Sequence, residues 1–179
     1  MSETAESILR TFRLDADIIK GLEEEAKRQG ATVNGLACRV LKNYVKIRAK
    51  LEPFGIVCMV KSDIIEIINS LDEDAIAKIA SKIGGLIAKE IIIQLYGDLS
   101  LENFRQFLET VICSFGDWAS YTEEVKEGYL EIRLGHNMGQ KWSVFMQNYI
   151  DSALMVITGK KTEFKYVSHY SVILNLKIH

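Results

Sequence analysis

The sequence predicts an α+β protein, in which an N-terminal strand and two helices precede a helical segment and a C-terminal β-β-α-β-β unit. Three observations lead to this prediction. Apolar and polar residues alternate over residues 11–14, which is the period of a strand. Apolar residues then recur every three or four positions, which is the period of a helix. After residue 116 the period of two returns in two pairs of short stretches that flank a helical one.

The composition is typical of a folded globular protein, with 179 residues of which 48% are hydrophobic and 26% are charged. The net charge is −2, but residues 1–50 carry ten Lys+Arg against seven Asp+Glu. A mildly basic N-terminal part suits contact with an anion. The three cysteines, Cys38, Cys58 and Cys113, are too far apart for a zinc knuckle or a disulfide framework. The acidic start and the lack of an apolar run of roughly 20 residues predict a cytoplasmic protein.

The first elements follow from Thr11-Phe12-Arg13-Leu14, which predicts a strand with one apolar face. Asp15 is expected to cap a first helix, and Gly30 to end it in the left-handed conformation. Thr32 or Asn34 is expected to cap a second helix, which runs to about residue 51. The apolar faces of the two helices comprise Ile18, Ile19, Leu22, Ala26, Val33, Leu36, Ala37, Val40, Leu41, Tyr44 and Val45.

A strand and two helices of this size cannot bury their own apolar face, because about 45 residues are too few for a lone core. The strand also has two unpaired edges. Antiparallel pairing of two copies satisfies both needs, and it produces a two-stranded ribbon that displays Thr11 and Arg13 twice. A ribbon of this kind fits the major groove of DNA.

The order of strand, helix, Gly30 and Thr32-Val33-Asn34 resembles the ribbon-helix-helix DNA-binding family of Arc, MetJ and CopG, over residues 8–48. The resemblance implies that Thr11 and Arg13 read base edges and that Thr32, Val33 and Asn34 bind phosphate at the start of a helix. The family usually has a third polar reader at the position of Leu9. Here Leu9 is predicted either to touch a thymine methyl or to lie outside a shorter ribbon, which leaves Arg10 for phosphate.

The domain boundary is predicted at Pro53 and Gly55, between a DNA-binding and dimerisation domain of residues 1–51 and a regulatory or oligomerisation domain of residues 55–179. Residues 56–60 fit either a short buried strand or the approach to a helix.

Ser62 is predicted to cap a helix over residues 63–71, and Asp72 or Asp74 to start another. That helix has Ile76, Ile79, Ala80, Ile83 and Ile87 at helical spacing, and Gly84-Gly85 is expected to interrupt or kink it. The run Ile91-Ile92-Ile93 leaves helix and strand open. Ser100 is expected to open a further helix.

A hairpin of residues 118–125 and 129–134 is predicted around Lys126-Glu127-Gly128. A helix is predicted from Gln140 to Ile157, and a final hairpin from residues 161–167 and 171–178. The inward positions of that helix are Trp142, Phe145, Met146, Tyr149, Ala153 and Val156.

Residues 135–142, at the junction of strand and helix, combine two glycines with His136, Asn137, Lys141 and Trp142. Backbone N–H groups at this helix start favour an anionic ligand, which predicts a sensing pocket. The alternative is a tight turn in which His136 makes a structural hydrogen bond and Trp142 fills the core. No metal site, cofactor or catalytic group is predicted, because the histidines His136, His169 and His179 are scattered and no nucleophile motif is present.

Together these features predict a prokaryotic, sequence-specific transcriptional regulator, a repressor acting as a dimer or a dimer of dimers. Its predicted partners are double-stranded DNA, further copies of itself and a small-molecule effector. Two alternatives stay open. One is an assembly protein that uses the N-terminal unit only to dimerise, and the other is an enzyme or carrier that uses the loop of residues 136–142.

Overall fold

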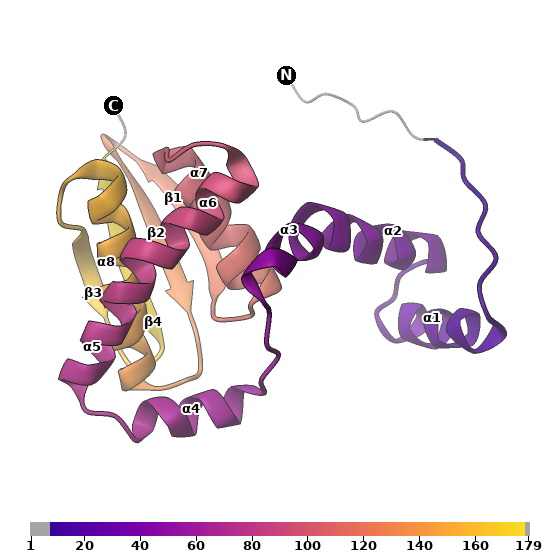
Figure 1. The fold of residues 1–179 in the computed structure, drawn as a ribbon, viewed down its shortest axis with the longest axis horizontal. Helices are drawn as coiled ribbons and strands as arrows, with labels where there is room; N and C mark the ends of the chain where they lie inside the picture. Colours follow the sequence, from indigo (N-terminus) through magenta and orange to yellow (C-terminus); the bar gives the residue numbers. More distant parts are fainter. Residues whose placement is uncertain (1–7, 178–179) are drawn as a thin grey trace. The chain divides into compact units, whose positions relative to one another are not determined.

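Two helices, α1 (Ala16–Arg28) and α2 (Val33–Asn43), form the folded part of the N-terminal unit (Figure 1). The computed structural model describes residues 8–177 and divides into the units Met1–Val45 and Lys46–His179.

The ends of the two helices are formed as the sequence predicts. Gly30 follows α1 with a φ of +62°, so it takes the left-handed conformation expected after a helix end. The Thr32 hydroxyl accepts a hydrogen bond from the Gly35 backbone N–H at 3.0 Å, so Thr32 rather than Asn34 caps α2. Asp15 occupies the N-cap position of α1 without a side-chain cap.

The predicted N-terminal strand is wrong, and with it the ribbon-helix-helix layout of the fold. Residues 8–15 lie outside any strand, and α1 is the first element of the described chain. The physical reason is that a strand needs a hydrogen-bonded neighbour, and residues 8–14 make no backbone hydrogen bond to another described residue. Alternation alone predicted the strand, and alternation does not supply the partner.

Short helical pieces connect α2 to the rest of the chain. They are the π-helix η1 (Tyr44–Arg48), α3 (Ala49–Leu51) and the 3₁₀-helix η2 (Glu52–Phe54). The helical path therefore ends near Leu51 and Pro53, as the sequence predicts. Gly55 follows with a φ of +71°.

The C-terminal unit begins with helices. They are α4 (Lys61–Asn69), α5 (Glu73–Lys82), the π-helix η3 (Ile83–Ile87), α6 (Ala88–Tyr96), α7 (Leu101–Phe107) and the π-helix η4 (Leu108–Phe115). The predicted caps Asp72 and Ser100 are confirmed, since their side chains accept hydrogen bonds from the N–H groups of Ala75 at 2.7 Å and Asn103 at 3.2 Å. The predicted cap at Ser62 is wrong, because α4 begins one residue earlier and Ser62 lies inside it.

Two antiparallel hairpins then enclose a long helix. The first joins β1 (Ser120–Lys126) to β2 (Tyr129–Gly135), and the second joins β3 (Glu163–Val167) to β4 (Ser171–Lys177). Between them lies α8 (Gln140–Thr158). The four strands form one sheet in the order β1-β2-β4-β3. The order of elements in this part matches the prediction, and Ile178, the last residue of the predicted hairpin, lies outside the described residues.

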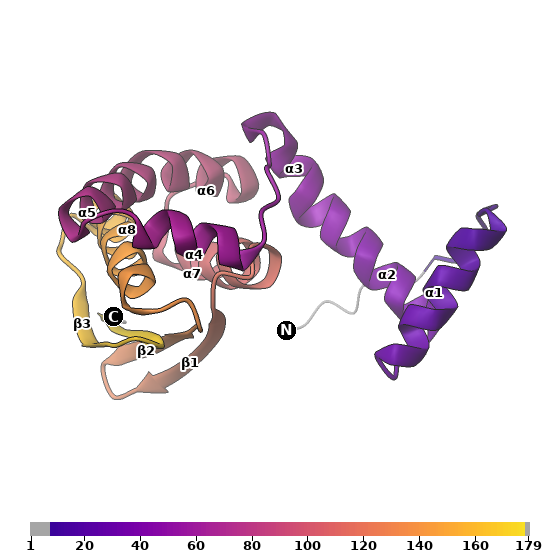
Figure 2. The ribbon, with the colours of Figure 1, turned by 90° about the horizontal axis from the view of Figure 1, so that it is seen from below.

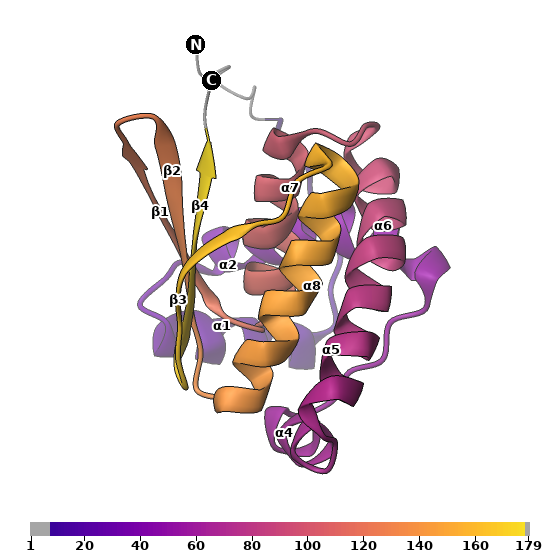
Figure 3. The same cartoon turned by 90° about the vertical axis from the view of Figure 1, so that its left-hand side faces the viewer.

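The C-terminal unit has a layer of helices on one face of the sheet (Figures 2 and 3). Helix α8 lies against the sheet, and α5 with η3 packs across α8. The inward residues of the central strands are fully buried, among them Ile132, Leu134 and Leu174. The core also takes Phe104 and Phe107 from α7.

Gly84 is the point of closest approach between η3 and α8. A Cβ atom at residue 84 would lie 2.1 Å from the backbone oxygen of Tyr149, a distance that no carbon atom tolerates. Gly85 faces more open space, with 3.9 Å to the Ser152 Cβ. The glycine pair predicted to interrupt the helix therefore lies in a π-helical turn, and Gly84 allows the two backbones to touch.

Several predicted core positions are exposed instead. Ile79, Ile87 and Val156 are 42%, 45% and 43% exposed, because the neighbouring elements cover these helix positions only in part. Residues 56–60 form no strand, and Val57 is 83% exposed. The run of residues 91–93 lies in helix α6.

Replacing Gly84 by alanine is expected to destabilise the protein by about 1–3 kcal/mol, because the added methyl group collides with the α8 backbone. The matched control is Gly85→Ala, which meets no close atom and gains about 0.5–1 kcal/mol from helix propensity. Urea unfolding of both variants measures the difference. Equal stabilities would contradict the assigned helix contact.

Candidate interaction surface

The N-terminal unit buries few of its apolar side chains. Ala26 and Leu36 are the buried contacts between α1 and α2, and Leu22, Val33 and Ala37 are half-buried beside them. The rest of the predicted apolar face is open. The exposed large apolar side chains of residues 8–45 are Ile8, Leu9, Phe12, Leu14, Ile18, Ile19, Val40, Leu41, Tyr44 and Val45.

The residues predicted to read bases are Leu9, Thr11 and Arg13, and they lie on the segment that precedes α1. Arg10, which was predicted to bind phosphate, lies on the same segment. All four residues are exposed and belong to no strand. Leu9 is 88% exposed. The structure therefore gives these four side chains no fixed common face.

Three of the four residues predicted to bind phosphate, Thr32, Val33 and Asn34, lie at the start of α2. The Thr32 hydroxyl accepts a hydrogen bond from the N–H of Gly35, and the Asn34 Oδ1 lies 4.0 Å from the Cys38 Sγ. Val33 is half-buried. Two of the three predicted phosphate ligands thus make contacts within α2 itself.

A polar network joins the end of α1 to α2. Arg28 donates to both carboxylate oxygens of Glu25, at 2.7 and 2.5 Å, and Gln29 donates to Glu25 as well. These hydrogen bonds, that of Arg28 first, lower the pKa of Glu25 to about 2. Arg39 of α2 donates to the Gln29 side chain. The charged groups where α1 meets α2 are therefore paired with one another.

His136 is held inside a hydrogen-bonded network rather than open to a ligand. Its Nδ1 accepts a hydrogen bond from the Met138 backbone N–H at 3.3 Å, and its Nε2 lies 2.8 Å from the Ser143 Oγ. The buried Ser143 hydroxyl donates to the Ser168 carbonyl. The ring proton must then be on Nε2, which donates to Ser143. An imidazole in this role does not activate a serine nucleophile.

The other residues of the predicted pocket also have structural roles. The Lys141 ammonium donates to the backbone carbonyls of Asn69, at 2.9 Å, and Leu71, at 2.5 Å, and so covers the end of α4. Trp142 is 3% exposed and stacks on Phe145 with ring centroids 5.0 Å apart. Asn137 is exposed. These contacts favour the tight-turn alternative over a sensing pocket.

No cluster of potential metal ligands exists among residues 8–177. Burial raises the pKa of the Cys113 thiol to about 12, so this thiol stays protonated. His169 is exposed, and His179 lies outside the described residues.

Sequence reasoning did not single out Glu131, a carboxylate on the sheet face opposite the helices. Its side chain is 0% exposed and contacts Lys165 at 2.7 Å, Lys126 at 2.9 Å and Arg133 at 2.5 Å. The hydrogen bonds from these cations, that of Lys165 first, lower the pKa of Glu131 to about 2. The only signal in the sequence was a charged residue between Leu130 and Ile132, which alternation places on the outer face.

No protein-family model matches the chain, and no curated protein matches it. Among solved structures, the chain is similar to a trafficking protein particle complex subunit 3 from Naegleria fowleri, which is covalently bound to palmitic acid. The two chains share 14% identity with a TM-score of 0.40, over 66% of this chain and 90% of the other. A likeness at this level carries no functional argument. Every helix within residues 8–177 is too short or too polar to cross a bilayer.

The predicted DNA-binding transcriptional regulator is wrong. The ribbon that was to enter the major groove is absent from residues 8–14. Double-stranded DNA is therefore withdrawn as the partner. The resemblance of α1, Gly30 and α2 to ribbon-helix-helix proteins stays a prediction.

Replacing Glu131 by glutamine is expected to lower the free energy of unfolding at neutral pH, because three cations lose their shared carboxylate. Since the pKa of Glu131 is lowered from 4.5 to about 2, the wild-type advantage is complete above pH 4.5 and disappears as the pH falls toward 2. Urea unfolding of both proteins between pH 7 and pH 2 measures this convergence. A constant difference across that range would refute the assignment.

The pKa of His136 is lowered from 6.5 by burial and then by the nearby Lys61 charge. The folded state therefore prefers the neutral ring, and stability should fall as the pH drops below 6.5. In His136→Gln this part of the pH dependence should vanish. An NMR titration of the imidazole checks the direction, and a raised pKa would contradict the structural role.

Proposed function

We propose that this chain is a component of a protein assembly and that residues 8–45 join two copies of it. The observation that carries the proposal is the mismatch between apolar content and burial in this unit. Ala26 and Leu36 are buried there, whereas ten large apolar side chains are exposed.

An exposed apolar surface of this kind is stabilised in water when another apolar surface packs against it. Burying apolar area stabilises by about 25 cal/mol per Å² removed from water, and a folded monomer rarely leaves a large apolar patch open. Gly30 ends α1 and Thr32 caps α2, and both features stabilise the helical conformation of this unit. Six of the ten exposed apolar side chains lie on α1, α2 and η1, and the other four precede α1.

A second copy of the chain is the occupant that the charges favour. Residues 8–45 carry seven Lys+Arg and five Asp+Glu, a near balance that does not repel an identical surface. A partner selected by charge would require a surface dominated by one sign. In a two-fold dimer each copy offers the same apolar patch, so one set of residues serves both sides.

The test introduces charge into the exposed part of α2. The full chain is expected to sediment as a dimer, and the double variant Val40→Asp, Leu41→Asp as a monomer. Val40 and Leu41 are 55% and 53% exposed in the single chain, and burying an unpaired carboxylate in the interface is unfavourable. We expect a loss of at least about tenfold in dimer affinity, or about 1.4 kcal/mol.

Lys42→Asp is the matched control, because one such change alters the net charge by the same −2 as the double variant. Lys42 is exposed on the same helix. The control should remain a dimer by analytical ultracentrifugation. A wild-type chain that sediments as a monomer at every concentration would refute the proposal, as would equal effects of the variant and its control.

A further inference from the structure

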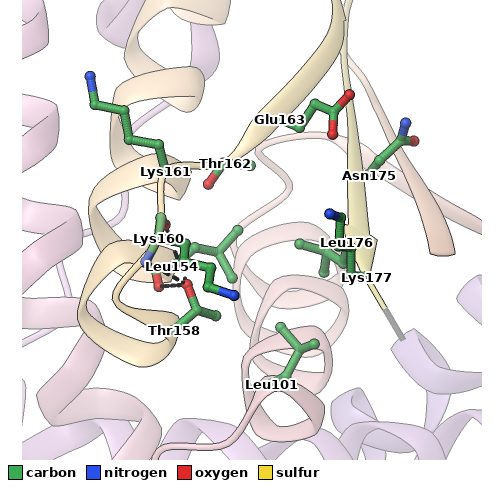
Figure 4. A pocket seen from close by; sticks show the side chains of 10 residues that line it. All are labelled: Leu101, Leu154, Thr158, Lys160, Lys161, Thr162, Glu163, Asn175, Leu176 and Lys177. Atoms are coloured by element: carbon green, nitrogen blue, oxygen red, sulfur yellow. Dashed lines mark hydrogen bonds between the residues drawn. The ribbon is translucent and has the colours of Figure 1, made fainter. Parts of the chain in front are cut away.

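A pocket of about 430 Å³ opens where α8 ends and β3 begins, far along the chain from the N-terminal unit (Figure 4). Its apolar lining comes from three different elements, through Leu101 of α7, Leu154 of α8 and Leu176 of β4. Leu154 and Leu176 are 2% and 7% exposed and belong to the core, so this lining is rigid. The volume lies in the range of small-molecule sites.

The rim of the pocket is positively charged. Lys160 and Lys177 line it, and neither ammonium group forms an ion pair with any residue between 8 and 177. In Figure 4 the Lys160 side chain extends between Leu154 and Leu101, over the apolar lining. Lys161 extends away from the other lining residues, so it adds charge at a distance. Glu163 is the carboxylate of the lining.

One polar atom of the lining also lacks a partner. The Thr162 hydroxyl is buried and makes no hydrogen bond within the described chain. The Asn175 Oδ1 is unpaired as well, but in Figure 4 it points away from the other lining residues. The backbone N–H of Thr162 donates to the Asp151 carboxylate at 2.7 Å. This hydrogen bond holds the Thr162 backbone in place, whereas the Thr162 hydroxyl has no partner in the described chain. Buried polar groups in folded proteins are nearly always paired, and an orphan group marks a place where a partner is missing.

The stability of the fold does not explain why the unpaired lysines and the unpaired hydroxyl occur together at this pocket. A helix end attracts lysines through its dipole, which accounts for Lys160, but the dipole does not account for Lys177 on β4 or for the unpaired hydroxyl. An apolar lining beneath unpaired ammonium groups matches a molecule with an anionic head and an apolar body.

We propose that this pocket binds a small organic anion, with its carboxylate or phosphate group between Lys160 and Lys177 and its apolar part on the three leucines. The Thr162 hydroxyl donates to the anionic group. This site is independent of the assembly surface of residues 8–45.

The test titrates the full chain with phenyl phosphate and benzoate, followed by NMR or calorimetry. Both probes are soluble, and benzyl alcohol and inorganic phosphate serve as the neutral and the purely ionic comparison. We expect saturable binding of at least one aromatic anion, and at least tenfold weaker binding of benzyl alcohol and of inorganic phosphate. The stronger of phenyl phosphate and benzoate identifies the head group.

The double variant Lys160→Ala, Lys177→Ala should reduce the affinity at least tenfold, whereas the control Lys82→Ala, Lys89→Ala should not change it. Both control lysines are exposed on the α5–α6 helices, outside the pocket. Thr162→Val should weaken the binding without lowering the stability of the free protein, because it removes an unpaired hydroxyl. No saturable binding, equal loss in the control, or tight binding of benzyl alcohol would each overturn the proposal. A Thr162→Val protein that unfolds more easily would overturn the role of this hydroxyl.

Discussion

The contact between Gly84 and the backbone of Tyr149 is the constraint on which the C-terminal unit depends. It brings η3 and α8 so close that no side chain fits between them. Helix α8 is then enclosed by helices on one side and by the sheet on the other (Figure 3). This position explains why α8 contributes eight buried residues, including Trp142 and Ser143, and why its sequence is apolar around much of its circumference.

The two ends of α8 differ in how their polar groups are used. At the first end, His136, Ser143 and Lys141 are all committed to hydrogen bonds within the fold. At the second end, the Lys160 ammonium group and the Thr162 hydroxyl have no partner among residues 8–177. A residue with an internal partner is satisfied in the free protein, and a residue without one gains from a ligand. The candidate ligand site therefore lies at the C-terminal end of α8 and not at its N-terminal end.

The N-terminal unit presents the opposite balance of burial and charge. Its charged groups Glu25, Arg28 and Arg39 are paired with near neighbours, while its apolar groups are exposed. In the C-terminal unit the apolar groups are buried, and even the carboxylate of Glu131 is enclosed by cations. The apolar faces of this unit, rather than its charges, therefore carry the proposed contact with a second copy.

The sequence by itself determined the local structure wherever the signal lies within a few residues. Helical spacing, the caps Thr32, Asp72 and Ser100, the glycine at residue 30 and the two C-terminal hairpins could all be predicted, because caps, turns and periodicity act over one or two helical turns. The sequence could not show whether residues 11–14 find a strand to pair with, because a strand depends on a distant or separate neighbour. The sequence also could not show that His136 lies within hydrogen-bonding distance of Ser143 or that three cations surround Glu131. It could not show that Lys160 and Lys177 line the same pocket. Those relations join residues from 2 to 34 positions apart, and the pairing of the strands and the packing of α8 against the sheet bring them together.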